Sequence, residues 1–112
     1  MGYEIRLYIL ENQKDICFEK VIASFNLFHE EMPSFKQLFS TPISSPLCVN
    51  GELVTTDSYG DSIMWARVDE VVEWLETEGV KLGYRKIAPA IALLNSFNLE
   101  DWDELRVAYY GY

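Results

Sequence analysis

The side chains that most often carry chemistry in proteins are scarce and widely spaced in this chain. The single histidine, His29, stands beside Glu30 and Glu31, and an imidazole with a neighbouring carboxylate can act as a general base. Together with Cys17 and Cys48 it could bind zinc, but these residues lack the closely spaced pairs that structural zinc sites use. We predict a protein that is not an enzyme and that needs no metal or other cofactor. A small enzyme that uses His29 with a nearby carboxylate is an alternative.

A short polar segment, Gly60–Ile63, resembles the serine-nucleophile block of the GDSL esterases. The resemblance implies a nucleophile at Ser62, which would need a histidine base later in the chain. Because His29 lies upstream, we predict that the segment is a polar turn whose glycine relieves backbone strain. The nearby Asp57 and Asp61 do not have the spacing of EF-hand ligands, and an Asx-type turn is predicted instead.

Negative charge gives a stronger signal than any catalytic motif. The chain has 18 acidic and 9 basic residues, and half of the acids fall within residues 68–78 and 100–104. Crowded carboxylates repel one another, so a chain keeps them for solubility or to meet something basic. The clustered acids are Asp69, Glu70, Glu73, Glu76, Glu78, Glu100, Asp101, Asp103 and Glu104.

The first acidic stretch has the apolar spacing of an amphipathic helix, with its carboxylates on the outer face. Each stretch also carries a tryptophan, and a partly exposed aromatic ring rimmed with acid is typical of interface hot spots. The alternative for Trp74 is that it closes the edge of the core. We predict that the acids steer a partner and that the tryptophans anchor it. The predicted binding residues are Glu70, Glu73, Trp74, Glu76 and Trp102.

The net charge of −9 limits what the protein can bind. Nucleic-acid phosphates and anionic membranes are bound through an excess of Lys and Arg, so we expect contact with neither. The acidic helix could instead imitate a nucleic acid, because its charge density is close to that of a DNA strand. Since its charges are spread around the helix rather than aligned, a nucleic-acid-mimicking inhibitor is only an alternative.

Length and composition fit a single domain over residues 1–112, of which 49% are hydrophobic and 14% aromatic. Glu4 and Arg6 stand where a signal peptide has its apolar segment, and no stretch has the length of a membrane span. We therefore expect a cytoplasmic protein in which Cys17 and Cys48 are buried thiols.

Several segments have the pattern of β-strands. Residues 3–10 alternate as a strand with one buried face, and Asn50-Gly51 favours a type I′ hairpin turn. Residues 16–28 fit either a helix or a strand, and their β-branched and aromatic content favours an antiparallel strand. The predicted strands are residues 3–10, 16–28, 47–49, 52–55 and 105–110.

Two main helices are predicted, over residues 68–78 and 86–97, and Gly79 is expected to end the first in a left-handed cap. The second should begin close to Ala88, because Pro89 is tolerated only in a first turn. A short helix through Phe39 follows Pro33, with Ser34 as its cap. The predicted fold is α+β, a single antiparallel sheet of four to five strands with two main helices packed on one face.

Two runs near the C-terminus, GYRKIAPAIALLNSF and WDELRVAYYGY, are similar to uncharacterised proteins carried by phages and prophages. The resemblance implies no activity and favours an inhibitor or host-interaction role. With the acidic stretches, it predicts a non-enzymatic protein-interaction module whose partner is the basic surface of another protein. An alternative is a structural subunit of a homo-oligomer that assembles through the C-terminal strand and its tyrosines.

Overall fold

The computed structural model describes residues 4–11, 19–28 and 32–112. The strands are β1 (Ile5–Glu11), β2 (Lys20–Phe28), β3 (Thr41–Pro42), β4 (Leu47–Val49), β5 (Glu52–Val54), β6 (Met64–Arg67) and β7 (Leu105–Gly111). The helices are α1 (Pro33–Lys36), α2 (Val68–Thr77) and α3 (Ile87–Asn95), with two 3-10 helices, η1 (Gly79–Leu82) and η2 (Leu99–Glu104).

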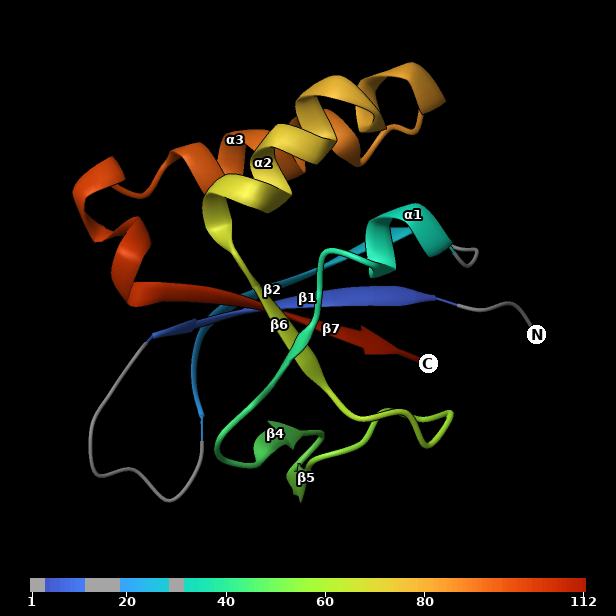
Figure 1. The fold of residues 1–112 in the computed structure, drawn as a ribbon, viewed down its shortest axis with the longest axis vertical. Coiled ribbons are helices and arrows are strands. Elements are labelled where there is room, and N and C mark those ends of the chain that lie inside the picture. Colours follow the sequence, from blue (N-terminus) through green and yellow to red (C-terminus); the bar gives the residue numbers. More distant parts are fainter. Residues whose placement is uncertain (1–3, 12–18, 29–31) are drawn as a thin grey trace.

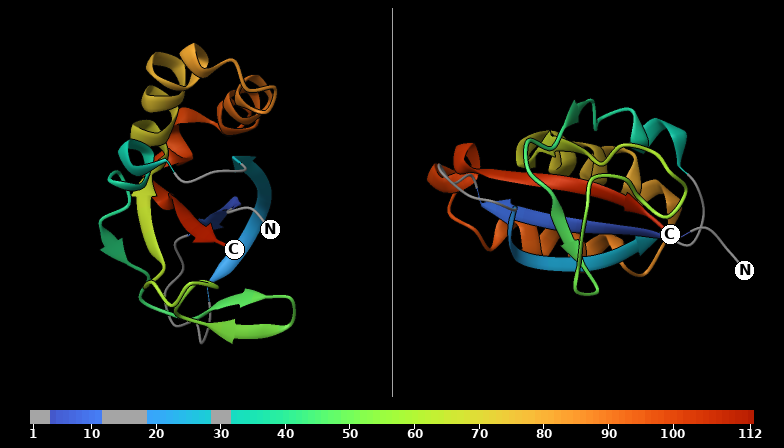
Figure 2. Two further views of the ribbon diagram at one scale, coloured as in Figure 1. Left: turned by 90° about the vertical axis from the view of Figure 1, so that its right-hand side faces the viewer. Right: turned by 90° about the horizontal axis from the view of Figure 1, so that it is seen from below.

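The main sheet is antiparallel and has the strand order β2-β1-β7-β6-β3. Helices α2 and α3 lie together on one side of this sheet, and the β4–β5 hairpin lies on the other (Figures 1 and 2). The predicted α+β class, with one main antiparallel sheet and two helices on one face, is confirmed. The hairpin, however, forms a two-stranded sheet of its own, and β6 and β3 complete the main sheet.

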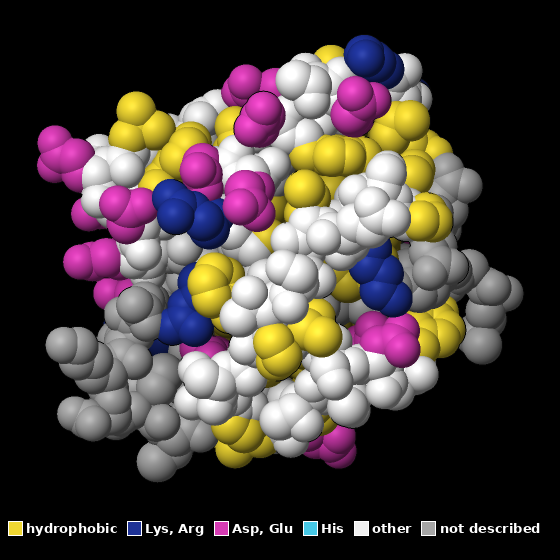
Figure 3. All heavy atoms as spheres, viewed as in Figure 1, with side chains coloured by type: hydrophobic (Ala, Val, Ile, Leu, Met, Phe, Trp, Pro, Cys, Tyr) yellow, Lys and Arg dark blue, Asp and Glu magenta, His cyan; other side chains and the backbone are white. Residues whose placement is uncertain are grey.

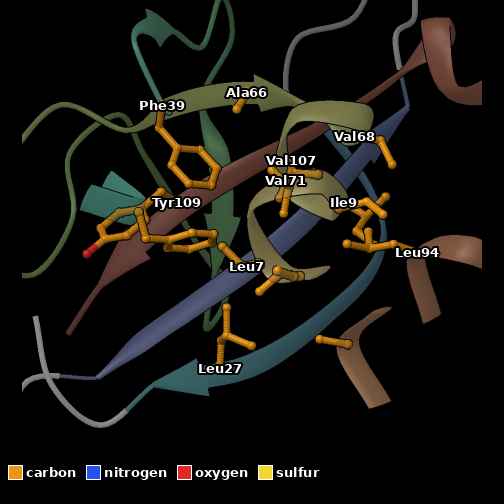
Figure 4. Packing of buried hydrophobic residues seen from close by; sticks show 14 of the residues in the cluster. Leu7, Ile9, Leu27, Phe39, Ala66, Val68, Val71, Leu94, Val107 and Tyr109 are labelled. Carbon is orange, nitrogen blue, oxygen red and sulfur yellow. The ribbon is translucent and has the colours of Figure 1, made fainter. Parts of the chain in front are cut away.

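Strands β1 and β7 form the centre of the sheet, in register from Ile5 opposite Gly111 to Glu11 opposite Leu105. Their side chains alternate between two buried clusters, and Figure 4 shows the cluster beneath α2. The helix-side cluster takes Ile5, Leu7, Ile9, Leu105, Val107 and Tyr109 from these strands. The hairpin-side cluster takes Tyr8, Leu10, Ala108 and Tyr110.

The prediction that the first strand has only one buried face is wrong for its second half. Tyr8 and Leu10 are only 5% and 0% exposed, because they pack in one cluster with Leu47 and Val49 of the hairpin. The hairpin therefore acts as a second layer on the sheet, and its apolar side chains face β1 and β7 rather than solvent.

The local strand predictions are mostly confirmed. Asn50 and Gly51 have φ values of 51° and 84°, as a type I′ turn requires, and β2 pairs antiparallel with β1. Residues 16–18, which include Cys17, lie outside the described residues. Cys48 is exposed on β4, so the prediction of a buried thiol there is wrong. Leu47 and Val49, on either side of it, point inward and are buried. Side chains alternate along a strand, so Cys48 between them points outward.

The predicted apolar stripe of α2 is confirmed, since Val68, Val71, Val72 and Leu75 are buried. The predicted left-handed cap at Gly79 is wrong, because this residue begins η1 instead. A Cβ placed on Gly79 would lie 3.4 Å from side-chain atoms of Leu75 and Ile87. The left-handed residue is Gly83, with a φ of 71°, because the chain makes one further turn before it reverses.

The other helix starts differ slightly from the predictions. Helix α3 begins at Ile87, which keeps Pro89 in its first turn, as expected. Helix α1 begins at Pro33 itself, with Met32 at the N-cap position and no side-chain cap hydrogen bond. The predicted cap at Ser34 is therefore wrong, because the fixed φ of proline suits the first helical position.

The packing of the hairpin on the sheet can be tested at Leu47, which is fully buried between the two. We expect Leu47→Ala to lower the free energy of unfolding by about 2–5 kcal/mol, because it leaves a cavity in the second cluster. Urea denaturation followed by circular dichroism measures this change. Cys48→Ser, at the adjacent exposed position, should change stability by less than about 0.5 kcal/mol. Equal effects of the two substitutions would show that the hairpin does not cover the sheet.

Candidate functional site

The outward face of α2 carries three of the predicted binding residues, Glu70, Glu73 and Glu76, all exposed. Among the described residues, none of these three carboxylates lies within ion-pair distance of a Lys or Arg. Figure 3 shows Asp and Glu side chains gathered over α2 and η2 on one side of the molecule. The helix therefore offers three carboxylates that no described Lys or Arg neutralises in a close ion pair.

Trp74 is half-buried on the same helix and is held from behind by the core. Its ring centroid lies 4.8 Å from that of Phe35, which is fully buried and in turn packs 5.2 Å from Phe39. The side chain closes the edge of the core and keeps an exposed portion, and its role as a contact residue stays a prediction. Aromatic contacts of this kind favour particular relative orientations of the rings.

A groove of about 220 Å³ runs beside this indole and is lined by Leu38, Glu70, Glu73, Trp74 and Thr77. Leu38 comes from the turn after α1, and the other four residues come from successive turns of α2. The Thr77 hydroxyl donates a hydrogen bond to the Glu73 carbonyl oxygen at 2.8 Å, so it is already satisfied within the helix. The groove combines an apolar wall with two carboxylates, and we call it the Trp74 groove.

The two acidic stretches meet at Arg67, the residue that precedes α2. Its Nε lies 3.1 Å from Asp69 Oδ1 and its Nη2 lies 3.3 Å from Asp103 Oδ1, which links α2 to η2. The hydrogen bond to Asp69, followed by the charges of Asp69 and Asp103, raises the pKa of Arg67 above its ordinary value. All three side chains are exposed, so the link organises the surface more than it stabilises the fold.

Trp102 lies in a different setting from Trp74. It is half-buried on η2, and its indole Nε1 is buried without a hydrogen-bond partner. It lines a hollow of about 210 Å³ together with Trp65, two arginines (Arg67 and Arg106) and one acid, Asp103. The Arg106 guanidinium lies 5.1 Å from the centre of the Trp65 ring. The structure thus brings Glu70, Glu73 and Trp74 together, with Glu76 on the same helix, and places Trp102 in a separate hollow that contains arginine.

The loop that resembles the esterase block forms the predicted turn. Asp57 Oδ1 accepts hydrogen bonds from the backbone N–H groups of Tyr59 and Asp61 at 2.9 and 3.1 Å, and Gly60 has a φ of 83°. Ser62 and Asp61 line a hollow of about 480 Å³, opposite Lys36. The Lys36 ammonium is ion-paired with Asp61 at 3.1 Å.

The esterase-like interpretation requires a histidine base for Ser62. A protonated ammonium such as that of Lys36 has no lone pair with which to take the serine proton. His29 lies outside the described residues. Within the three described ranges, no three His, Cys, Asp or Glu side chains converge as metal ligands.

Comparisons with protein-family models, with curated proteins and with solved structures find no match. No helix in the described part of the chain is both long enough and apolar enough to cross a membrane.

The different charge around the two indoles can be measured by fluorescence quenching. One variant keeps only Trp74 (Trp65→Phe and Trp102→Phe), and its counterpart keeps only Trp102 (Trp65→Phe and Trp74→Phe). Relative to free tryptophan amide, we expect the ratio of caesium to iodide quenching to be about twofold higher for Trp74 than for Trp102, because nearby carboxylates concentrate cations. The Stern–Volmer slopes of the two variants give this ratio. Equal ratios would contradict the assignment of an acidic groove beside Trp74.

Proposed function

We propose that this protein is a non-enzymatic, cytoplasmic interaction module that captures the basic surface of another protein through the outer face of α2. The proposal rests on one observation: Glu70 and Glu73, which have no close ion-pair partner among the described residues, flank an indole that the core holds in place. Carboxylates of this kind steer a cationic partner, and an immobilised tryptophan anchors it at low entropic cost. Trp102 stays a predicted contact, in the neighbouring hollow across Arg67.

The energetics of the free helix support a role in binding. Glu70, Glu73 and Glu76 follow one another at three-residue spacing, and like charges at such spacing destabilise a helix by about 0.2–0.5 kcal/mol per pair. The last turn of α2 contains no basic residue to offset the helix dipole. Cations from a partner would relieve both effects, so the carboxylates that weaken the free helix would strengthen the complex.

The alternative of a homo-oligomer built on the C-terminal strand has less support. β7 is an interior strand whose two edges pair with β1 and β6, and Tyr109 and Tyr110 are only 4% and 9% exposed. β1 covers one edge of β7 along its whole length and β6 covers the other from Arg106 to Tyr109, and neither tyrosine is exposed for a partner to contact. The resemblance to phage and prophage proteins agrees better with capture of a host protein, and we include an inhibitory or host-interaction role in the proposal.

Charge reversal on α2 tests the proposal. We expect the combined change Glu70→Lys, Glu73→Lys and Glu76→Lys to leave the circular dichroism spectrum unchanged and to weaken partner binding at least about tenfold, because it replaces attraction by repulsion at the contact. The partner is first identified with the unmodified protein, by affinity purification from the native host and mass spectrometry. Its affinity for each variant is then measured by surface plasmon resonance.

A matched control reverses three acids of η2 (Glu100→Lys, Asp101→Lys and Glu104→Lys), which changes the net charge by the same amount, from −9 to −3 (−9 + 6). Long-range steering depends on the total charge of the protein, so this control should slow association. The contact at α2 itself is left intact, so the dissociation rate should stay nearly unchanged. Unchanged binding after reversal on α2, or equal losses in both variants, would refute the α2 surface as the contact.

A further inference from the structure

The size of the Trp74 groove restricts what can fill it. Its volume of about 220 Å³ is below the range of about 300–1,000 Å³ that pockets for drug-sized ligands occupy. The groove is also open along the surface of α2, between that helix and the turn that carries Leu38. A single protruding side chain fits these dimensions better than a metabolite does.

The chemistry of the lining calls for a side chain that is apolar along its length and cationic at its tip. Trp74 and Leu38 present apolar surface, while Glu70 and Glu73 supply two carboxylates at the same groove. Lys and Arg are the side chains that combine an aliphatic stem with a positive head, and they cover apolar surface with the stem. Charge complementarity therefore selects a cationic residue of the partner.

Arginine meets these requirements more fully than lysine. Its planar guanidinium can stack on an indole and donate hydrogen bonds to two acceptors at once, whereas the lysine ammonium is a compact, strongly hydrated charge. The protein contains one such arginine–indole contact, with Arg106 at 5.1 Å from the Trp65 ring centre. On tyrosine rings it places one arginine, Arg6 at 5.9 Å from Tyr112, and one lysine, Lys36 at 5.8 Å from Tyr109.

We infer that the Trp74 groove is an arginine-binding site, in which a partner's guanidinium stacks on Trp74 and donates hydrogen bonds to Glu70 and Glu73. The inference rests on the proposed function and names the chemical group of the partner that this groove recognises. Arg67 does not occupy the groove, because its guanidinium is directed to Asp69 and Asp103.

An NMR titration with small probes tests the site without knowledge of the partner. Nα-acetyl-arginine amide is added to the ¹⁵N-labelled full chain, and the indole N–H signals of its 3 tryptophans are followed. We expect a saturable shift of the Trp74 signal with a dissociation constant of about 1–10 mM, the weak affinity of one side chain. The Trp65 and Trp102 signals serve as internal controls and should move much less.

Two further probes define the chemistry of the site. The lysine analogue should bind at least about threefold more weakly, because it lacks the planar fork, and the neutral citrulline analogue should give no saturable shift. In the protein, Glu73→Gln should weaken arginine binding about threefold to tenfold, since it removes one charged acceptor. Glu104→Gln, which alters an exposed acid outside the groove, should leave binding unchanged.

The outcomes separate this inference from the proposed function. Equal shifts of all three indoles, equal affinity for lysine and arginine, or no shift at Trp74 would each overturn the arginine site. If that happens while charge reversal on α2 still abolishes partner binding, the proposed function stands and only the arginine site is lost. If arginine binds at Trp74 and charge reversal leaves partner binding intact, the site exists and the proposed function is wrong.

Discussion

The pairing of β1 with β7 is the constraint on which the other elements depend. It brings segments from opposite ends of the described chain into register along seven residues and buries side chains on both of its faces. One face needs a cover of apolar residues from α2 and α3, and the other needs the hairpin. Because α2 must turn Val68, Val71 and Leu75 toward the sheet, Glu70 and Glu73 have no position but the outside.

The predictable part of the fold consists of features that short stretches of sequence determine. The φ > 0 requirement of a two-residue hairpin identifies Asn50-Gly51, and the 3.6-residue period identifies α2. Strand β6 escaped prediction because its four residues are too few for a periodic signal, and its pairing with β7 is non-local. The packing of the hairpin on the sheet also depends on contacts between residues far apart in the sequence, which no local pattern predicts.

The candidate site was predictable to a similar extent. Helical spacing was enough to place Glu70, Glu73, Trp74 and Glu76 on one helix, where they are found. Leu38 could not be assigned to the site, because its position depends on how the turn after α1 packs beside α2. The ion pair of Arg67 with Asp69 could have been expected from the sequence, because the two residues are only two positions apart. Its ion pair with Asp103 could not, because it joins the start of α2 to η2, far along the chain.

Trp74 and Trp102 have similar neighbours in the sequence but lie in separate hollows of the structure. Both indoles are flanked by acids in the sequence, yet the neighbours in space differ. Trp74 lies beside two carboxylates, whereas Trp102 shares its hollow with two arginines and one carboxylate, Asp103. Cross-strand pairing of β6 with β7 places these two arginines opposite each other, beside Trp102. The same composition therefore produces two surfaces of different chemistry.

The outermost strand on the β6 side also affects how the protein behaves at high concentration. β3 has only two residues, and the second, Pro42, has no amide hydrogen with which to continue a hydrogen-bonded ladder. Short edges that contain proline are a common defence against the edge-to-edge addition that leads to aggregates. At this end, the sheet cannot readily recruit a strand from a neighbouring molecule, which helps an aromatic-rich chain to stay dispersed.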